Sequence, residues 1–286
     1  MKFTGERFIL NEIFGDIEVE HLHRYEVAKK FAAGLDVLDA ASGAGYGSNI
    51  LASVAKSVVG IDISEESVQY SQKNFQRENL RYEVASVEKI PLENNSVDLI
   101  VSFETIEHVP EDVQYKFLDE IKRVLRPNGK LIMSSPDKLT YSDLPHFNNE
   151  YHVHELYESE FRSLIEKYFV NAKFFTQGIT EQRFDLIKSA DSPFEKISLL
   201  TDFYVPKLSE RYWLTVASDS EIGGLDELNS LHSFNASDIA YCQVFDNVHS
   251  GGGIYKFKNN PDGRRYFFGN IRPFGVRKSH KNYFYA

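Results

Sequence analysis

Acidic and histidine side chains gather at two places in the sequence where they could do chemistry. The segment SFETIEHV places Glu104, Glu107 and His108 at positions i, i+3 and i+4, so one helical turn would bring all three to one face. His152 lies further on, in the segment NEYHVHELYESEF. Two carboxylates and two imidazoles from these positions make an oxygen and nitrogen site that suits Mg²⁺ or Mn²⁺.

Without a metal, the same side chains indicate acid–base chemistry. Glu107, His108 and His152 are then the catalytic candidates. His108 is the best general base among them, because an imidazole titrates near neutral pH. His154 is a second choice, with a surface position as its alternative. The sequence leaves metal and base open, since both use the same residues.

A second candidate site is the stretch DAASGAGYG at 39–47. Asp39 ends a predicted strand, and Gly43, Gly45 and Gly47 follow at every second position. Glycines in a strand-to-helix turn let the backbone bend sharply and approach a ligand closely. Dinucleotide sites have a different glycine spacing and bind a pyrophosphate, which the Asp39 carboxylate would repel. The acid suits a cationic ligand instead.

Polar residues also follow the next two predicted strands. Asp62 closes the strand VVGIDI about 17 residues after Gly45, where a carboxylate can accept both ribose hydroxyls of a nucleoside. Ser86, Val87 and Glu88 follow the third strand, where an adenine edge would lie. The alternatives are a helix N-cap neighbour for Asp62 and a solvated surface acid for Glu88. Taken together, the ends of three successive strands indicate a nucleoside-bearing cation.

An alternating α/β pattern would position these residues. From residue 35 onward, short apolar runs alternate with amphipathic stretches, which is typical of α/β folds. Strands are predicted over 36–40, 58–63, 81–86, 97–103, 129–136, 171–177 and 211–218. Helices are predicted over 20–32, 46–55, 65–78, 112–126 and 157–169.

Four motifs in this frame, VLDAASGAGYGS, VVGIDIS, VDLIVSFETIEHV and LRPNGKLIMSSP, resemble those of class I S-adenosylmethionine-dependent methyltransferases in order and spacing. The resemblance covers about residues 35–220. It implies a Rossmann-like, seven-stranded, mostly parallel sheet with helices on both faces, and S-adenosyl-L-methionine as cofactor. The cofactor contacts that it implies are Asp39, Ala41, Gly43, Gly45, Gly47, Asp62, Ile63, Ser86, Val87, Glu88, Phe103 and Glu104. Ala41 and Ser42 stand where relatives often have Cys or Gly.

The N-terminal segments TGERF and EHLHRY resemble those of bacterial methyltransferases that act in surface-polysaccharide and O-antigen synthesis. In those enzymes the stretch closes over the cofactor, which makes His23, Arg24 and Tyr25 candidate lid residues. Arg24 and Tyr25 join the cofactor-binding candidates, and Arg24 could pair with the cofactor's carboxylate. The alternative is an amphipathic helix packed on the sheet with its cations in solvent.

The pattern E-x-x-E-H with a distant H-x-x-E resembles the metal site of small-RNA 3′-terminal 2′-O-methyltransferases. This resemblance makes Glu104, Glu107, His108 and His152 the metal ligands. E-x-x-E-H is also common in methyltransferases without a known metal, where Glu104 faces the cofactor and Glu107 is structural. The formal net charge of −10 gives no general attraction to nucleic acid, which weakens the RNA alternative.

Composition sets the remaining expectations for the 286-residue chain. Its single cysteine, Cys242, cannot form an intramolecular disulfide, and no run is apolar and long enough to span a membrane, so we expect a soluble cytoplasmic protein. We expect an N-terminal lid, a methyltransferase domain with a partly helical insertion, and a C-terminal extension with a basic, aromatic tail, over 1–34, 35–219 (insertion 178–210) and 220–286. The tail segments IYKFK, NNPDG and RRYFFGN predict a β-hairpin.

The function expected from this sequence is O-methylation of a sugar hydroxyl, or of a sugar-linked phosphate, in a bacterial surface glycan or its precursor. One alternative is 2′-O-methylation of RNA 3′ ends. Another is a non-catalytic scaffold that binds the cofactor and serves glycan assembly. The tail could contact an assembly partner or a second copy of the chain.

Overall fold

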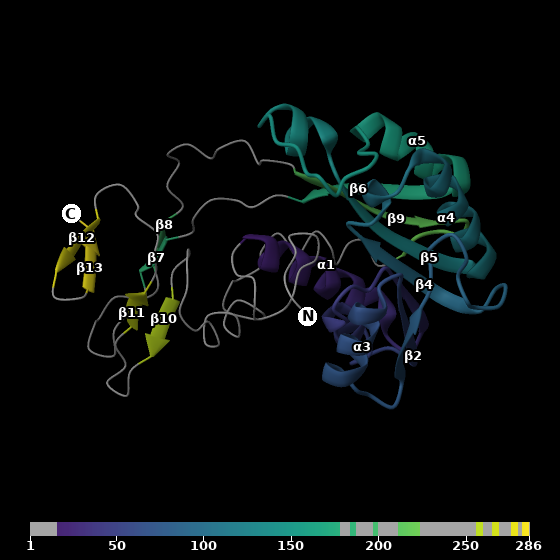
Figure 1. Ribbon diagram of the computed structural model, residues 1–286, viewed down its shortest axis with the longest axis horizontal. Helices are drawn as coiled ribbons and strands as arrows, with labels where there is room; N and C mark the ends of the chain where they lie inside the picture. Colours follow the sequence, from purple (N-terminus) through teal and green to yellow (C-terminus); the bar gives the residue numbers. More distant parts are fainter. Residues whose placement is uncertain are drawn as a thin grey trace.

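The computed structural model describes residues 16–177 and 211–223 continuously, together with six short strands in the remaining sequence. Its main feature is a seven-stranded sheet with the order β3-β2-β1-β4-β5-β9-β6 (Figure 1). These strands are β1 (Asp36–Ala40), β2 (Ser57–Asp62), β3 (Leu80–Val84), β4 (Val97–Phe103), β5 (Leu125–Pro136), β6 (Asn171–Gln177) and β9 (Tyr212–Ser218). β9 runs antiparallel to both neighbours, and the pairs among β1 to β5 are parallel.

Helices cover both faces of this sheet, as predicted (Figure 1). They are α1 (Asp16–Ala32), α2 (Tyr46–Leu51), α3 (Glu65–Asn74), α4 (Glu111–Val124) and α5 (Glu158–Tyr168). The strands alternate between two cores: in β1, Leu38 packs with residues of α4 and α5, whereas Val37 packs with residues of α1 and α2. The Rossmann-like fold is therefore confirmed.

The predicted elements exist, with shifts mainly at their ends. The predicted strands 97–103 and 171–177 match β4 and β6, and the predicted N-terminal helix is found as α1. α2 ends at Leu51 rather than at residue 55, and α3 ends at Asn74 rather than at residue 78. β5 begins at Leu125, directly after α4, because Leu125 already pairs with Val97 of β4.

The insertion and the tail are described only in part. In the insertion, which the sequence predicts to be partly helical, β7 (Phe184–Leu186) pairs antiparallel with β8 (Ile197–Leu199). The predicted tail hairpin is confirmed, since β10 (Lys256–Asn259) pairs with β11 (Arg265–Phe268). A further hairpin joins β12 (Val276–Ser279) to β13 (Asn282–Tyr285). Cys242, the TGERF segment and the expected tail contacts lie outside the described residues.

None of the helices in the described ranges combines the length and the apolar character that a membrane crossing requires. α1 differs from the amphipathic helix that the alternative expected. It packs against α2 and β4, and its cation Arg24 is fully buried, while Lys30 on the same helix is exposed. The alternative with all the helix cations in solvent is therefore wrong for Arg24.

The packing of α1 on the start of α2 requires a residue without a side chain at position 47. A Cβ atom at Gly47 would overlap the Tyr25 ring, so Gly47→Ala must push α1 off this position. We expect a loss of roughly 1–3 kcal/mol in the free energy of unfolding, the usual cost of overpacking. Urea denaturation followed by circular dichroism measures it.

Gly223→Ala is the matched control. A Cβ atom there meets no atom within 4 Å, so the free energy of unfolding should stay within about 0.5 kcal/mol of the starting protein. Equal stability of the two variants would contradict the described packing of α1.

Candidate functional site

The carboxyl ends of β1, β2 and β4 meet at one edge of the sheet. β1 and β4 are neighbours in the sheet. The connection after β1 leads to β2 on one side of this pair, and the connection after β4 leads to β5 on the other side. Open α/β sheets bind their ligands at such a switch point. Three residues singled out in the sequence lie in the last positions of these strands: Asp39 in β1, Asp62 in β2 and Phe103 in β4.

The turn after β1 is shaped by backbone conformations that favour glycine. Gly45 is the N-cap residue of α2, with φ at 80°, and Gly43 has φ at 54°. Asp62 holds this turn from the neighbouring strand. One of its carboxylate oxygens accepts from the Gly43 N–H at 3.0 Å, and the other accepts from the Ser64 N–H at 2.9 Å. Asp62 thus lies beside the glycine turn and close to the next helix.

Residues expected around the nucleoside lie near Asp62. The Ala85 N–H donates to the Asp62 carbonyl at 3.0 Å, which places the chain after β3 next to the end of β2. Ser86 turns that chain by accepting from the Glu88 N–H at 3.2 Å. Ile63 is 71% exposed and offers an apolar surface beside Asp62.

Asp39 lies fully buried under the first helix. Its carboxylate accepts from the Tyr25 hydroxyl at 3.1 Å and from the Ser48 hydroxyl at 2.6 Å. Burial raises the pKa of Asp39 from 3.8 to about 7, against the lowering effect of these two hydrogen bonds. The Tyr25 ring also packs edge-on against Phe103, with centroids 5.0 Å apart. The structure therefore brings three of the predicted cofactor residues together.

Arg24 enters the same region from α1. One of its guanidinium nitrogens donates to Gln177 at 2.7 Å and lies 3.6 Å from the Glu104 carboxylate, and the guanidinium lies over the Tyr212 ring at 4.6 Å. Its Nε and Nη2 atoms have no hydrogen-bond partner among the described residues. A buried cation with unused donors can receive an anion from a ligand.

Glu104 departs from the expected helical turn. Its φ of 51° lies in the left-handed region, where a residue with a side chain is strained. Ser134 of β5 holds this conformation, since its hydroxyl donates to the Glu104 carboxylate at 2.6 Å and accepts from the Glu104 N–H at 3.2 Å. The helical turn begins only after it, as a short 3₁₀ helix over Ile106–His108.

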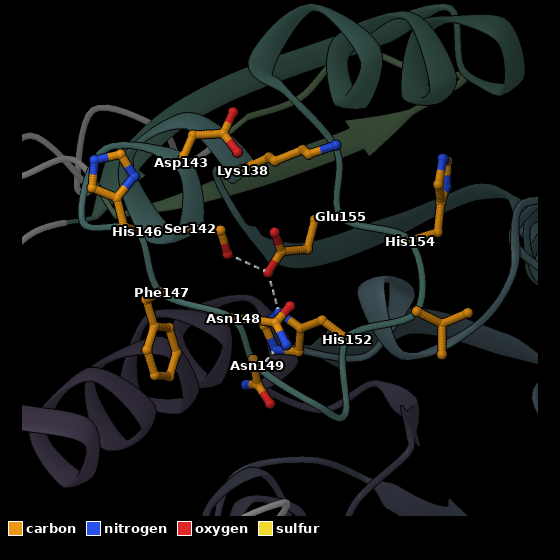
Figure 2. Close-up of a pocket in the computed structure, with 11 residues that line it drawn as sticks. Lys138, Ser142, Asp143, His146, Phe147, Asn148, Asn149, His152, His154 and Glu155 are labelled. Atoms are coloured by element: carbon orange, nitrogen blue, oxygen red, sulfur yellow. Dashed lines mark hydrogen bonds and ion pairs between the residues drawn. The ribbon is translucent and has the colours of Figure 1, made fainter.

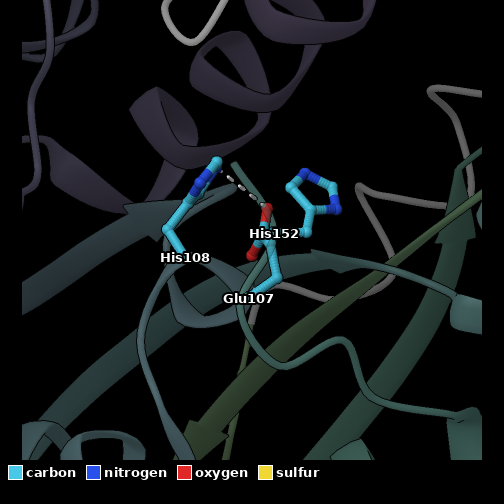
Figure 3. Close-up of side chains that lie close together, drawn as sticks. All are labelled: Glu107, His108 and His152. Carbon is cyan, nitrogen blue, oxygen red and sulfur yellow. Dashed lines mark ion pairs between the residues drawn. The ribbon is translucent and has the colours of Figure 1, made fainter. Parts of the chain in front are cut away.

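The other three candidates meet, as Figure 3 shows. One ligand atom from each of Glu107, His108 and His152 lies within 4.8 Å of the others, and the two imidazole rings are 4.9 Å apart. Within the described ranges this cluster leaves out Glu104, which instead contacts Ser134 and Arg24. The structure thus groups three of the four predicted ligands and places Glu104 apart from them, because residue 104 precedes the helical turn.

Hydrogen bonds orient both imidazoles of the cluster. His108 Nδ1 lies 2.9 Å from the Tyr151 carbonyl, which can only accept, so that nitrogen carries the proton. His152 Nδ1 contacts the Glu155 carboxylate, while its Nε2 lies 2.9 Å from the Asn149 amide nitrogen. Nε2 of His152 is therefore an acceptor. Such orientation suits either a general base or a metal ligand.

Glu107 is the least satisfied member of the cluster. It is fully buried, and neither of its carboxylate oxygens has a hydrogen-bond partner among the described residues. His108 Nε2 lies 3.8 Å from one of them. Burial, together with the nearby Glu104 charge, raises the pKa of Glu107 well above its usual range. A carboxyl group in this condition is typical of a functional position.

Several side chains that support the site were missed by the sequence analysis. Glu155 is the acid of H-x-x-E, and Ser134 lies in the motif LIMSSP, so both had a signal in motifs already quoted. Gln177 and Asn149 had none, since nothing in their local sequence indicates contact with α1 or His152. His154 contacts Gln114 at 3.1 Å and is not part of the cluster.

Comparisons with known proteins agree with this geometry. Residues 38–133 match the family model described as a methyltransferase domain. The chain is 38% identical over 137 residues to a probable S-adenosylmethionine-dependent methyltransferase of Mycolicibacterium smegmatis, covering 47% of this chain and 51% of that protein. It is 35% identical over 172 residues to another of that name from Mycobacterium tuberculosis, covering 58% of this chain and 60% of that protein.

A solved structure shows the same fold. It is a chain of the complex that contains the Trm112 methyltransferase activator of Haloferax volcanii, with 20% identity and a TM-score of 0.51 over 72% of this chain and 92% of that chain. The matched part of the sequence spans about half to three fifths of the length of the two curated relatives. Fold, glycine turn and matches agree: residues 38–133 match a methyltransferase domain, and the chain is similar to proteins described as probable S-adenosylmethionine-dependent methyltransferases.

Proposed function

We propose that the whole protein is an S-adenosylmethionine-dependent O-methyltransferase that acts on a sugar hydroxyl, or a sugar-linked phosphate, of a bacterial surface glycan or its precursor. The observation that carries the proposal is the arrangement at the sheet edge. One side of the proposed site consists of Asp39, Asp62 and the glycine turn at the carboxyl ends of β1 and β2, and the other consists of the cluster of Glu107, His108 and His152 beside the turn after β4. A methyl donor on the first side would face an acceptor oxygen on the second.

The cofactor side has a partner for each part of S-adenosylmethionine. Asp62 would accept the ribose hydroxyls, and the exposed Ile63 side chain would cover the adenine. Asp39 would lie near the positively charged methionine part, and the unused guanidinium donors of Arg24 suit its carboxylate. α1 then acts as the lid, with Tyr25 packed over the loop.

The acceptor side supplies proton removal. Methyl transfer from a sulfonium is an in-line displacement in which the carbon–sulfur bond breaks as the carbon–oxygen bond forms, so positioning supplies much of the catalysis. A sugar hydroxyl also loses its proton, which His108 would accept at Nε2, since Nε2 of His152 already accepts from the Asn149 amide. S-adenosylhomocysteine leaves with the electron pair of the broken bond. A phosphate acceptor would need no such base.

The same cluster also fits a divalent cation, which the proposal includes as Mg²⁺ or Mn²⁺. Glu107, His108 and His152 would hold it, because the Glu107 carboxylate has no other hydrogen-bond partner in the described structure and the two imidazoles are oriented by Tyr151 and Glu155. A cation there would lower the pKa of an acceptor hydroxyl. The net charge of −10 favours a sugar over RNA as the acceptor. The proposal keeps the expected cytoplasmic location.

Replacing Asp62 tests the ribose contact. Asp62→Ala should weaken S-adenosylhomocysteine binding by roughly 1–3 kcal/mol, as isothermal titration calorimetry would measure. Because Asp62 also holds the glycine turn, the 2′-deoxyribose analogue should be measured as well. It should bind the starting protein less tightly than S-adenosylhomocysteine does, and the difference should vanish in the variant.

Glu93→Gln is the control for the loss of one negative charge. Glu93 is exposed and is not one of the residues proposed to bind the cofactor. Its affinity for S-adenosylhomocysteine should stay within twofold of the starting protein. Unchanged cofactor affinity in Asp62→Ala would remove Asp62 from the site.

Cofactor affinity should also depend on pH. With its pKa at about 7, Asp39 is largely protonated below neutral pH and must lose that proton to pair with a cation. S-adenosylmethionine should therefore bind more tightly as the pH rises from about 5.5 to 8, by at most about tenfold per pH unit. Asp39→Asn should lose this slope, and an unchanged slope in that variant would assign the titration to another group.

His108→Ala separates chemistry from cofactor binding. We expect kcat to fall by roughly 10²–10⁴-fold, as for loss of a general base, with S-adenosylhomocysteine affinity within twofold. Transfer from labelled cofactor should be measured with Mg²⁺, with Mn²⁺ and with EDTA. Loss of turnover in EDTA would assign the cluster to a metal, and EDTA-resistant turnover would assign His108 as the base. Full activity of His108→Ala would exclude both roles for this residue.

A further inference from the structure

A cavity of about 460 Å³ opens in the segment between β5 and α5 (Figure 2). Its size lies in the range of roughly 300–1,000 Å³ that holds a small molecule rather than a polymer. Contacts between side chains hold the floor of the cavity in place. Ser142 donates to Glu155 at 2.8 Å, Glu155 contacts His152, and Tyr141 stacks on the His152 ring at 5.2 Å. The cavity therefore has a preformed polar floor.

This cavity adjoins the acceptor side of the site. The N–H groups of Val153 and His154 both donate to the Glu107 carbonyl, at 2.8 and 3.0 Å, and so dock the cavity segment onto the turn after β4. His152 belongs to the cavity wall and also to the cluster with Glu107 and His108. A molecule in the cavity would thus present one end to the catalytic candidates.

The lining alternates hydrogen-bond donors and acceptors. Lys138 donates, the Asp143 and Glu155 carboxylates accept, and the Asn148 amide does both. Neither Asn148 nor His146 makes a side-chain hydrogen bond with another described residue. Hydroxyl groups are the ligands that match such a lining, because each of them donates and accepts at once.

One wall residue offers a flat apolar surface. Phe147 is 52% exposed, and its ring packs edge-on against Tyr141 with centroids 5.7 Å apart. The neighbouring backbone fixes this rim: His146 has φ at 52°, and the Phe147 N–H donates to the Ser142 carbonyl at 2.9 Å. An aromatic ring held at the rim of a polar cavity can cover the apolar C–H face of a sugar ring.

Charge narrows the class of ligand further. Among the 11 described residues that line the cavity, Lys138 is the single permanent cation, against the two carboxylates of Asp143 and Glu155. Lys138 is also engaged over the Tyr157 ring at 4.9 Å, and the Tyr157 hydroxyl donates to Asp143 at 2.8 Å. Phosphate recognition calls for an excess of positive charge, which this lining lacks.

We infer that this cavity holds the acceptor, and that it takes a neutral, hydroxyl-rich sugar ring rather than a phosphorylated one. The inference rests on the proposed function and narrows it to a sugar hydroxyl. Asn148 and Phe147 determine specificity: the amide binds ring hydroxyls and the aromatic ring covers the opposite face. The methylated hydroxyl is the one that points to His152 and His108.

Binding to the full chain tests this directly. Methyl glycosides of neutral hexoses and deoxyhexoses, the matching sugar phosphates and a short RNA are titrated in the presence of S-adenosylhomocysteine, and followed by ligand-observed NMR. Neutral glycosides should bind. Asn148→Ala and Phe147→Ala should each weaken that binding about three- to tenfold, the usual effect of losing one such contact. Where a glycoside is methylated, its KM should rise by the same factor.

Val170→Ala is the matched control, because Val170 is 81% exposed between α5 and β6 and does not line the cavity. Its glycoside affinity, and the cofactor affinity of all three variants, should stay within twofold. Glycoside binding that ignores Asn148→Ala and Phe147→Ala, or binding of sugar phosphates or RNA alone, overturns the inference.

The two proposals fail separately. Neutral glycosides that bind through Asn148 and Phe147 but never accept a methyl group would refute the methyltransferase proposal and leave the cavity as a sugar site. Methyl transfer to a sugar that is unaffected by both variants would keep the activity and place the acceptor elsewhere. Absence of any glycoside binding overturns the cavity assignment.

Discussion

Tyr25 occupies the space that a side chain at Gly47 would need, and its hydroxyl reaches the buried carboxylate of Asp39. Through these contacts, α1, which precedes the sheet in the sequence, packs directly on the loop after β1. The same ring packs edge-on against Tyr46 of α2 and Phe103 at the end of β4. Removal of α1 would expose Asp39 and take away the Tyr25 ring that packs on Gly47. The helix and the loop therefore have to be treated as one unit of the site.

Arg24 extends this unit across the sheet. Burying a guanidinium is costly unless it finds an opposite charge and hydrogen bonds. Arg24 finds both, in Glu104 and in Gln177 at the last position of β6. The Gln177 amide also donates to the backbone carbonyl of Glu20 at 3.0 Å. Gln177 therefore binds α1 both at its backbone and at the Arg24 side chain. The strained backbone at Glu104 persists because two different elements hold its carboxylate: β5 through Ser134 and α1 through Arg24.

The sequence predicts the fold well because the fold depends on local patterns. Alternating apolar runs place every strand of the main sheet, and Ser64 marks the start of α3, where its hydroxyl accepts from the Ser67 N–H. The positions of the residues proposed to bind the cofactor could also be predicted, since glycines and acids at strand ends carry a local signal. Burial of Arg24 could not be predicted, because its partners Glu104 and Gln177 lie 80 and 153 residues away.

Helical spacing failed at Glu104 for a related reason. The i, i+3, i+4 pattern assumes that the helix starts at the first acid, but Ser134 of a different strand holds residue 104 outside helical conformation. This displacement divides the acids between two roles. Glu104 contacts Arg24 and Ser134, whereas Glu107 lies with His108 and His152. The break in helical conformation between residues 104 and 106 thus gives two carboxylates three residues apart different partners.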